Sequence, residues 1–142
     1  MPSFPTKSRG ILAFLSVNPS RAKLSLIGFL SLMSYNGFMK YQVITTTLFS
    51  KWLSKLKDRQ AVKAIALRIA RAEMGNLGDT QPVGEGVSEM RIFVGKGYRI
   101  YFAIRQERVI VLINGGIKSN KKQQQADIAL AQKMLRELEK KA

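Results

Sequence analysis

The sequence predicts an α+β domain, in which helices cover an antiparallel sheet. A β-branched run near residue 41 is followed by two segments with helical apolar spacing, then by three alternating segments with short connections. A last helical stripe lies near the C-terminus. This order predicts an N-terminal strand and a helical hairpin packed on an antiparallel sheet of three to four strands, with a C-terminal helix.

The N-terminal strand and the helical hairpin are predicted between residues 41 and 79. Residues 41–47 are rich in β-branched side chains, which favour a strand, and residues 48–56 carry apolar side chains at helical spacing. Asp58 is the predicted N-cap of a second helix, which ends at the glycine-containing stretch 75–79. The apolar stripe of this helix consists of Val62, Ile65, Ala66, Ile69 and Ala70.

The sheet is predicted to follow a loop at residues 80–88, which contain one proline and two glycines. Three strands are expected, at about residues 89–94, 98–104 and 109–114. Their short connections predict an antiparallel meander. Gly115–Gly116 should end the last strand, and the polar run 118–125 should lead to the C-terminal helix.

Residues 1–38 differ in composition from the rest of the chain. They carry four basic residues, no acidic residue and three of the four prolines. Neither of their apolar patches reaches the roughly 18 residues of a membrane span, although Arg21 and Lys23 precede one patch in the manner of a signal peptide. We favour an upstream extension with Met39 as the natural start, which makes 39–142 the domain. A secretory role and an added interaction arm are the alternatives.

The composition limits the chemistry that the chain can perform. The net charge is +15, from 24 basic and 9 acidic residues, which indicates an anionic partner such as nucleic acid, an acidic protein segment or a membrane surface. Cysteine is absent, which excludes disulfides, thiolate metal sites and thiol nucleophiles. Histidine is also absent, so the commonest general base near neutral pH is missing.

Strand alternation places a candidate site on one face of the sheet. Successive side chains point to opposite faces, so Arg99 and Tyr101 share a face of their strand, and Arg91 shares the corresponding face of the preceding strand. The apolar residues of the opposite face should pack against the helices. We therefore expect Arg91, Arg99 and Tyr101 to lie together on the outer, concave side. A solvated arginine or a packing tyrosine is the plainer interpretation of each residue alone.

These residue types suit the cleavage of RNA by internal transfer. That reaction needs a base for the 2′-hydroxyl, cations for the charge on the phosphorane, and an acid for the leaving oxygen. Arginine suits the second task because its planar fork holds two phosphate oxygens and keeps its charge. Tyrosine or lysine could move the protons, and neighbouring arginines should lower the pKa of either group. Such a site should be slow unless the substrate is positioned by something else.

Six ordered segments carry a family resemblance, and they are 49–53 (FSKWL), 58–61 (DRQA), 75–79 (GNLGD), 82–92 (PVGEGVSEMRI), 97–102 (GYRIYF) and 115–119 (GGIKS). From Tyr41 onward the chain resembles the RelE/ParE superfamily of toxins, in particular the HigB-like addiction module killer proteins. One departure is Ile117, where the family segment has an aspartate.

The resemblance implies a ribosome-dependent endoribonuclease that cuts messenger RNA in the cytoplasm and needs neither metal nor cofactor. It also implies a cognate antitoxin, expected to be a helix-turn-helix protein. Arg91 and Arg99 would bind or stabilise phosphate, while Tyr101 and Lys118 would assist proton transfer or substrate placement. The further lysines predicted to contact RNA are Lys63, Lys96, Lys121 and Lys122. The alternatives are a ParE-like inhibitor of DNA gyrase and a catalytically inactive RNA-binding relative.

Overall fold

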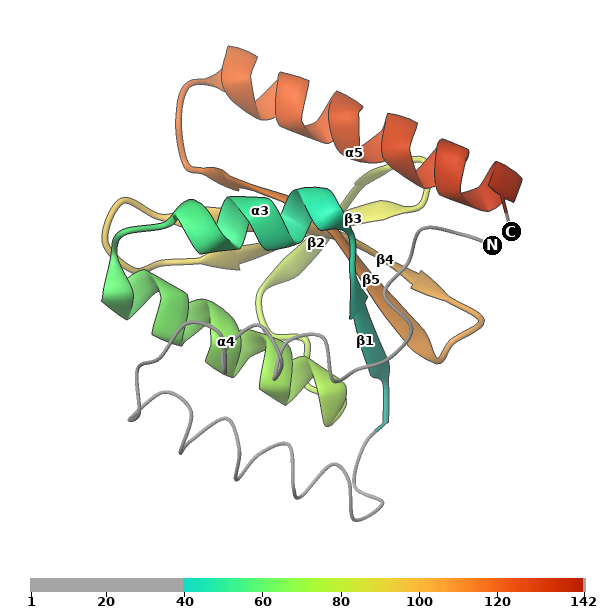
Figure 1. Cartoon of the computed structure of the whole chain (residues 1–142), viewed down its shortest axis with the longest axis horizontal. Coiled ribbons are helices and arrows are strands. Elements are labelled where there is room, and N and C mark those ends of the chain that lie inside the picture. Colours follow the sequence, from blue (N-terminus) through green and yellow to red (C-terminus); the bar gives the residue numbers. More distant parts are fainter. Residues whose placement is uncertain (1–39, 142) are drawn as a thin grey trace.

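The computed structural model describes residues 40–141, which form eight helices and strands (Figure 1). In chain order they are β1 (Gln42–Thr45), α3 (Thr47–Lys55), α4 (Arg59–Glu73), β2 (Thr80–Gly84), β3 (Val87–Ile92), β4 (Tyr98–Arg105), β5 (Val109–Ile117) and α5 (Lys121–Lys141). The interpretations of residues 1–38 and of Met39 as a start lie outside the described residues. No helix within 40–141 is long and apolar enough to cross a membrane.

The predicted α+β class is confirmed, and the sheet has five strands in the order β1-β5-β4-β3-β2. Strands β2 to β5 form the antiparallel meander. β1 adds to it beside β5 in parallel, with Gln42 opposite Val109 and Thr45 opposite Leu112. The chain between β1 and β5 runs through the helical hairpin and β2 to β4, which allows this parallel pairing, since parallel strands need a long crossover connection.

Each helix of the hairpin begins with a side-chain cap. The Thr46 hydroxyl accepts a hydrogen bond from Phe49 N at 3.1 Å, and the Asp58 carboxylate accepts one from Ala61 N at 3.1 Å. Each cap satisfies a backbone donor that has no partner within the helix. The N-cap predicted at Asp58 is therefore confirmed, and α4 runs back in roughly the opposite direction to α3 (Figure 1).

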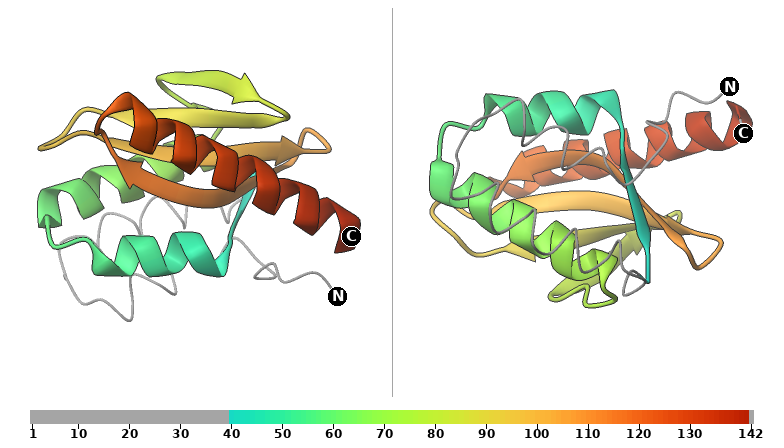
Figure 2. Two further views of the ribbon diagram at one scale, coloured as in Figure 1. Left: turned by 90° about the horizontal axis from the view of Figure 1, so that it is seen from above. Right: turned by 60° about the horizontal axis from the view of Figure 1, so that its bottom comes forward.

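Each face of the sheet has its own apolar core, which confirms the predicted alternation along β4. Tyr98, Ile100 and Phe102 belong to the cluster formed with α3 and α4. Tyr101 and Ala103 point the other way and belong to a second cluster, to which α5 contributes Ile128, Ala131 and Leu135. Figure 2 shows the sheet with helices on both sides. The face that we expected to be open is therefore partly covered by α5.

The prediction of a loop at residues 80–88 is wrong, because this stretch contains β2, a tight turn and the start of β3. The turn uses positive φ angles at Gly84 (102°), Glu85 (53°) and Gly86 (81°). The strand tolerates Pro82 because β2 is the edge of the sheet and pairs with β3 alone. Pro82, Gly84 and Gly86 therefore belong to a β-hairpin, which hydrophobic periodicity did not predict.

Two predicted boundaries near the C-terminus also need correction. β5 continues through Gly115 and Gly116 to Ile117 instead of ending before them. A Cβ atom at Gly115 would collide with the Trp52 ring, and one at Gly116 would lie 2.5 Å from the Asp127 carboxylate. The two glycines thus let α3 and α5 approach opposite faces of one strand. α5 begins within the polar run, where Asn120 Oδ1 accepts a hydrogen bond from Gln123 N at 2.8 Å.

Candidate functional site

The centre of the candidate site is the pair formed by Arg91 and Arg99. The two residues are direct partners across β3 and β4, so their side chains lie on the same face of the sheet, as predicted. The Arg91 side chain is 32% exposed and the Arg99 side chain 16% exposed. Like charges placed directly opposite each other repel, so the pair requires neighbouring anions.

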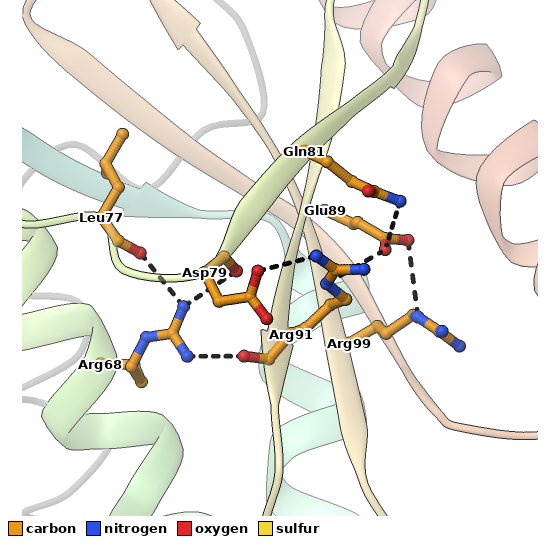
Figure 3. Close-up of polar contacts among 7 residues, drawn as sticks. All are labelled: Arg68, Leu77, Asp79, Gln81, Glu89, Arg91 and Arg99. Carbon is orange, nitrogen blue, oxygen red and sulfur yellow. Dashed lines mark hydrogen bonds and ion pairs between the residues drawn. The ribbon is translucent and has the colours of Figure 1, made fainter.

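Two carboxylates supply that compensation, and sequence patterns did not identify either as part of the site. The Glu89 side chain is fully buried, and its carboxylate oxygens lie 3.5 Å from Arg99 Nε and 3.9 Å from Arg91 Nε. Arg91 Nη2 also donates to Asp79 Oδ1 at 2.8 Å. Figure 3 shows Arg91 between Asp79 and Glu89, with Arg99 on the other side of Glu89. The far end of the Arg99 guanidinium points away from this network.

The hydrogen bonds at Glu89 are incomplete. Gln81 Nε2 donates to Glu89 Oε2 at 3.2 Å, whereas Glu89 Oε1 and the Nε atoms of both arginines are buried without a hydrogen bond. These three atoms therefore interact by charge at distances too long for good hydrogen bonds. The arrangement orients both guanidinium groups. It does not engage the terminal nitrogens of Arg99.

Arg68 supports this network from α4, and it too was not recognised in the sequence. Its guanidinium donates to the backbone carbonyls of Arg91 at 2.6 Å, Leu77 at 3.1 Å and Asp79 at 3.2 Å. Burial lowers the pKa of Arg68, and the charge of Asp79 acts in the opposite direction. Because this side chain lies on the flank of an amphipathic helix, its pattern was indistinguishable from that of a solvated arginine.

Lys118 completes the cationic part of the site. Arg91, Phe93, Arg99 and Lys118, together with Ile92, Gly97 and Tyr98, line one small depression of about 10 Å³. The Lys118 amide donates to the Gly97 carbonyl at 2.8 Å, which ties the end of β5 to the β3–β4 turn. A volume of this size holds about one water molecule, so a larger ligand must lie across the depression. Three of the four predicted catalytic residues are therefore together.

Tyr101 is the fourth predicted catalytic residue, and its expected exposure is wrong. It lies on the same face as the arginines, but it is only 1% exposed because it packs in the cluster that contains α5. Burial raises the pKa of Tyr101, the charges of Asp127 and Glu89 also raise it, and Arg99 lowers it, so that the pKa is about 12. The expected lowering of the tyrosine pKa by the arginines is thus outweighed by loss of solvent.

The predicted RNA-contacting lysines lie in three different places. Lys96 is exposed in the β3–β4 turn, close in sequence to the depression, and Lys121 and Lys122 are exposed at the start of α5. Lys63 is exposed on α4, which belongs to the core cluster of the opposite face. Among residues 40–141, no three acidic side chains lie close enough together to hold a metal ion.

Comparisons with known proteins relate this chain to a protein family and to a bacterial protein. The model of the family described as "Phage derived protein Gp49-like (DUF891)" matches residues 51–136. An uncharacterised protein of Haemophilus influenzae is 41% identical over 100 residues, which cover 70% of this chain and 98% of that protein. The family match begins in α3 and ends in α5, so it includes both arginines and their carboxylate partners. The chain therefore belongs to the Gp49-like family of phage-derived proteins.

Proposed function

We propose that this protein is the toxin of a toxin-antitoxin pair, related to RelE/ParE toxins, and that it cleaves messenger RNA on the ribosome. The observation that carries the proposal is the direct cross-strand pairing of Arg91 and Arg99 at a depression shared with Lys118. The basic surface implied by a net charge of +15 supports an RNA partner. The resemblance of six sequence segments to HigB-like toxins supports the specific reaction.

The arginine pair suits the charge that develops during phosphodiester cleavage. A guanidinium keeps its positive charge at any physiological pH and offers donors in a planar fork that matches phosphate oxygens. Glu89 and Asp79 orient the two groups in advance, and preorganised donors stabilise a transition state without reorganising during the reaction. Arg91 and Arg99 therefore bind the scissile phosphate and stabilise the phosphorane in this proposal.

The site has few groups suited to proton transfer. This favours a cleavage reaction that depends on the ribosome. The chain has no histidine, and a Tyr101 pKa of about 12 leaves this phenol poorly suited to act as a base at neutral pH. Lys118 is the remaining candidate for proton transfer because it lines the depression. Positioning of the RNA by the ribosome would recover rate through proximity. A cognate antitoxin, of the helix-turn-helix class, is part of the same proposal.

The proposal is tested by inducing the full chain in a bacterium and mapping transcript ends by primer extension. We expect new ends inside translated regions, and we expect them to disappear when translation initiation is blocked. Arg99→Ala should lower the cleavage rate by about 100-fold, as expected for loss of one preorganised charge donor. Lys133→Ala is the matched control, because Lys133 is an exposed cation of α5 outside the depression.

Three outcomes would contradict the proposal. Intact messages together with inhibited DNA supercoiling would identify a gyrase inhibitor of the ParE kind. RNA binding without cleavage, and without growth arrest, would identify an inactive relative. Equal loss of cleavage in Arg99→Ala and Lys133→Ala would show that general basicity, and not the arginine pair, is responsible.

A further inference from the structure

Phe93 is the most exposed large apolar side chain among residues 40–141. It is 73% exposed, whereas Leu130, Ile117 and Ile104 are about half as exposed, at 42%, 41% and 39%. A single exposed apolar residue is common on protein surfaces and needs no explanation by itself. Its position relative to the arginine pair is what distinguishes Phe93.

Phe93 lies beside the arginine pair. It directly follows the last residue of β3, two positions after Arg91. It lines the depression together with Arg91, Arg99 and Lys118. It belongs to neither apolar core. The aromatic ring of Phe93 therefore lies next to three cationic side chains.

The backbone around Phe93 is held in place from two directions. The Gly97 amide donates to the Val94 carbonyl at 2.9 Å, and the Lys118 amide donates to the Gly97 carbonyl at 2.8 Å. A Cβ atom at Gly95 would lie 2.7 Å from Asp58 Oδ2, so the turn also packs closely against the N-cap of α4. A ring on a well-supported turn loses little conformational freedom when a ligand covers it.

We propose that Phe93 is a stacking platform for one unpaired RNA base, next to a phosphate held by Arg91 and Arg99. Single-stranded RNA offers anionic phosphates and flat aromatic bases at short spacing, which matches cations beside an exposed ring. The depression holds only about 10 Å³, so the base lies over the ring and is not enclosed. Because stacking accepts every base, this contact adds affinity and position but little base preference. The inference rests on the proposed function.

The test is fluorescence anisotropy with the purified full chain and labelled eight-nucleotide 2′-O-methyl RNA, which has no 2′-hydroxyl to attack the phosphate. A second probe is the same backbone without bases. Phe93→Ala should weaken binding to the intact RNA by about fivefold or more. It should leave binding to the abasic backbone unchanged, and Phe93→Trp should restore the affinity for intact RNA. Leu130→Ala, which removes another exposed apolar side chain, should have no effect on either probe.

Salt dependence separates stacking from phosphate binding. Phe93→Ala should keep the wild-type slope of log affinity against log salt, since it removes no phosphate contact. Arg99→Ala should weaken binding to both probes and make the slope shallower by about 0.7. Thermal denaturation of each variant establishes that the fold is retained.

The outcomes distinguish this inference from the proposed function. If Arg99→Ala weakens binding and Phe93→Ala does not, the stacking platform is wrong while the phosphate site survives. If Phe93→Ala weakens binding to intact and abasic probes equally, stacking is also wrong. If the wild-type chain binds neither probe, the stacking platform is wrong, whereas the proposed cleavage is decided separately by the transcript ends mapped in cells. Retained RNA affinity together with lost antitoxin binding in Phe93→Ala would assign the ring to a protein partner and overturn the proposal.

Discussion

The Glu89 carboxylate offsets the repulsion between the two arginines of the candidate site. Two arginines in direct cross-strand register repel each other, and this cost is offset only if an anion lies close to both. Glu89 is fully buried and within 4 Å of the Nε atoms of Arg91 and Arg99. A buried charge that loses its partners is strongly destabilising, so the carboxylate and the arginines depend on one another.

Glu89→Gln should therefore destabilise the protein although the side chain keeps its shape. The change removes the negative charge between two guanidinium groups whose Nε atoms are buried. We expect the free energy of unfolding to fall by about 2 kcal/mol, less than for a fully buried pair because both arginines are partly exposed. Urea denaturation monitored by Trp52 fluorescence measures the change.

Glu85→Gln is the matched control for this prediction. Glu85 also pairs with an arginine, at 2.7 Å from Arg136, but these side chains are 56% and 53% exposed. Exposed ion pairs contribute roughly 0 to 1 kcal/mol, so this variant should be nearly as stable as the wild type. An equal loss in both variants would show that Glu89 has no special role between the arginines.

At the scale of elements, Arg68 connects α4 to the strands that carry the site. Its guanidinium reaches the carbonyls of Leu77 and Asp79, which precede β2, and that of Arg91 in β3. Close approach is possible because Gly78 has no side chain, and a Cβ atom there would lie 2.9 Å from the guanidinium. α4 therefore fixes the segment from which Asp79 holds Arg91.

Arg68→Gln should loosen this segment, since a glutamine is too short to satisfy all three carbonyls. We expect a loss of about 2 kcal/mol in the free energy of unfolding, from carbonyls that lose a charged donor. Amide hydrogen exchange should become faster in β2, which is the edge strand. Arg71→Gln changes an exposed arginine of the same helix and should leave exchange in β2 unaltered. Unchanged exchange in Arg68→Gln would contradict the supporting role.

At the scale of the whole molecule, Glu73 joins the helical hairpin to the first strand. Its backbone carbonyl accepts hydrogen bonds from Lys40 N at 2.7 Å and Tyr41 N at 3.0 Å, immediately before β1. The residue is only 3% exposed, and burial raises its carboxyl pKa from 4.5 to about 7. The fold therefore favours the protonated form of this carboxyl, in contrast to an exposed glutamate.

This raised pKa predicts a stability that decreases with pH. The unfolded chain releases the Glu73 proton near pH 4.5 and the folded chain near pH 7. The contribution of this bound proton to the free energy of unfolding is therefore fully present below pH 4.5 and lost as pH rises through 7. The full difference corresponds to about 3 kcal/mol. Glu73→Gln should therefore be more stable than the wild type at pH 8 and similar to it at pH 4.5. A pH-independent difference in Tm between the two proteins would exclude this explanation.

The α+β class and the faces of the sheet could be predicted because period and alternation are local properties of the chain. The stripe from Val62 to Ala70 identified α4, and alternation placed Arg91 and Arg99 on one side before any contact was known. Their neighbours could not be predicted in this way. Asp79 and Glu89 reach the arginines through strand register, and neither has a sequence signature of its own.

The sequence by itself determined which residues alternate, which helices are amphipathic and which way the two arginines face. Only the tertiary structure decided that β1 pairs with β5 in parallel, that α5 covers Tyr101, and that Gly115 and Gly116 lie inside a strand. The physical reason is that alternation assigns a side chain to a face without specifying what covers that face. Packing of distant segments then decides whether a residue is solvated, as Phe93 is, or buried, as Tyr101 is.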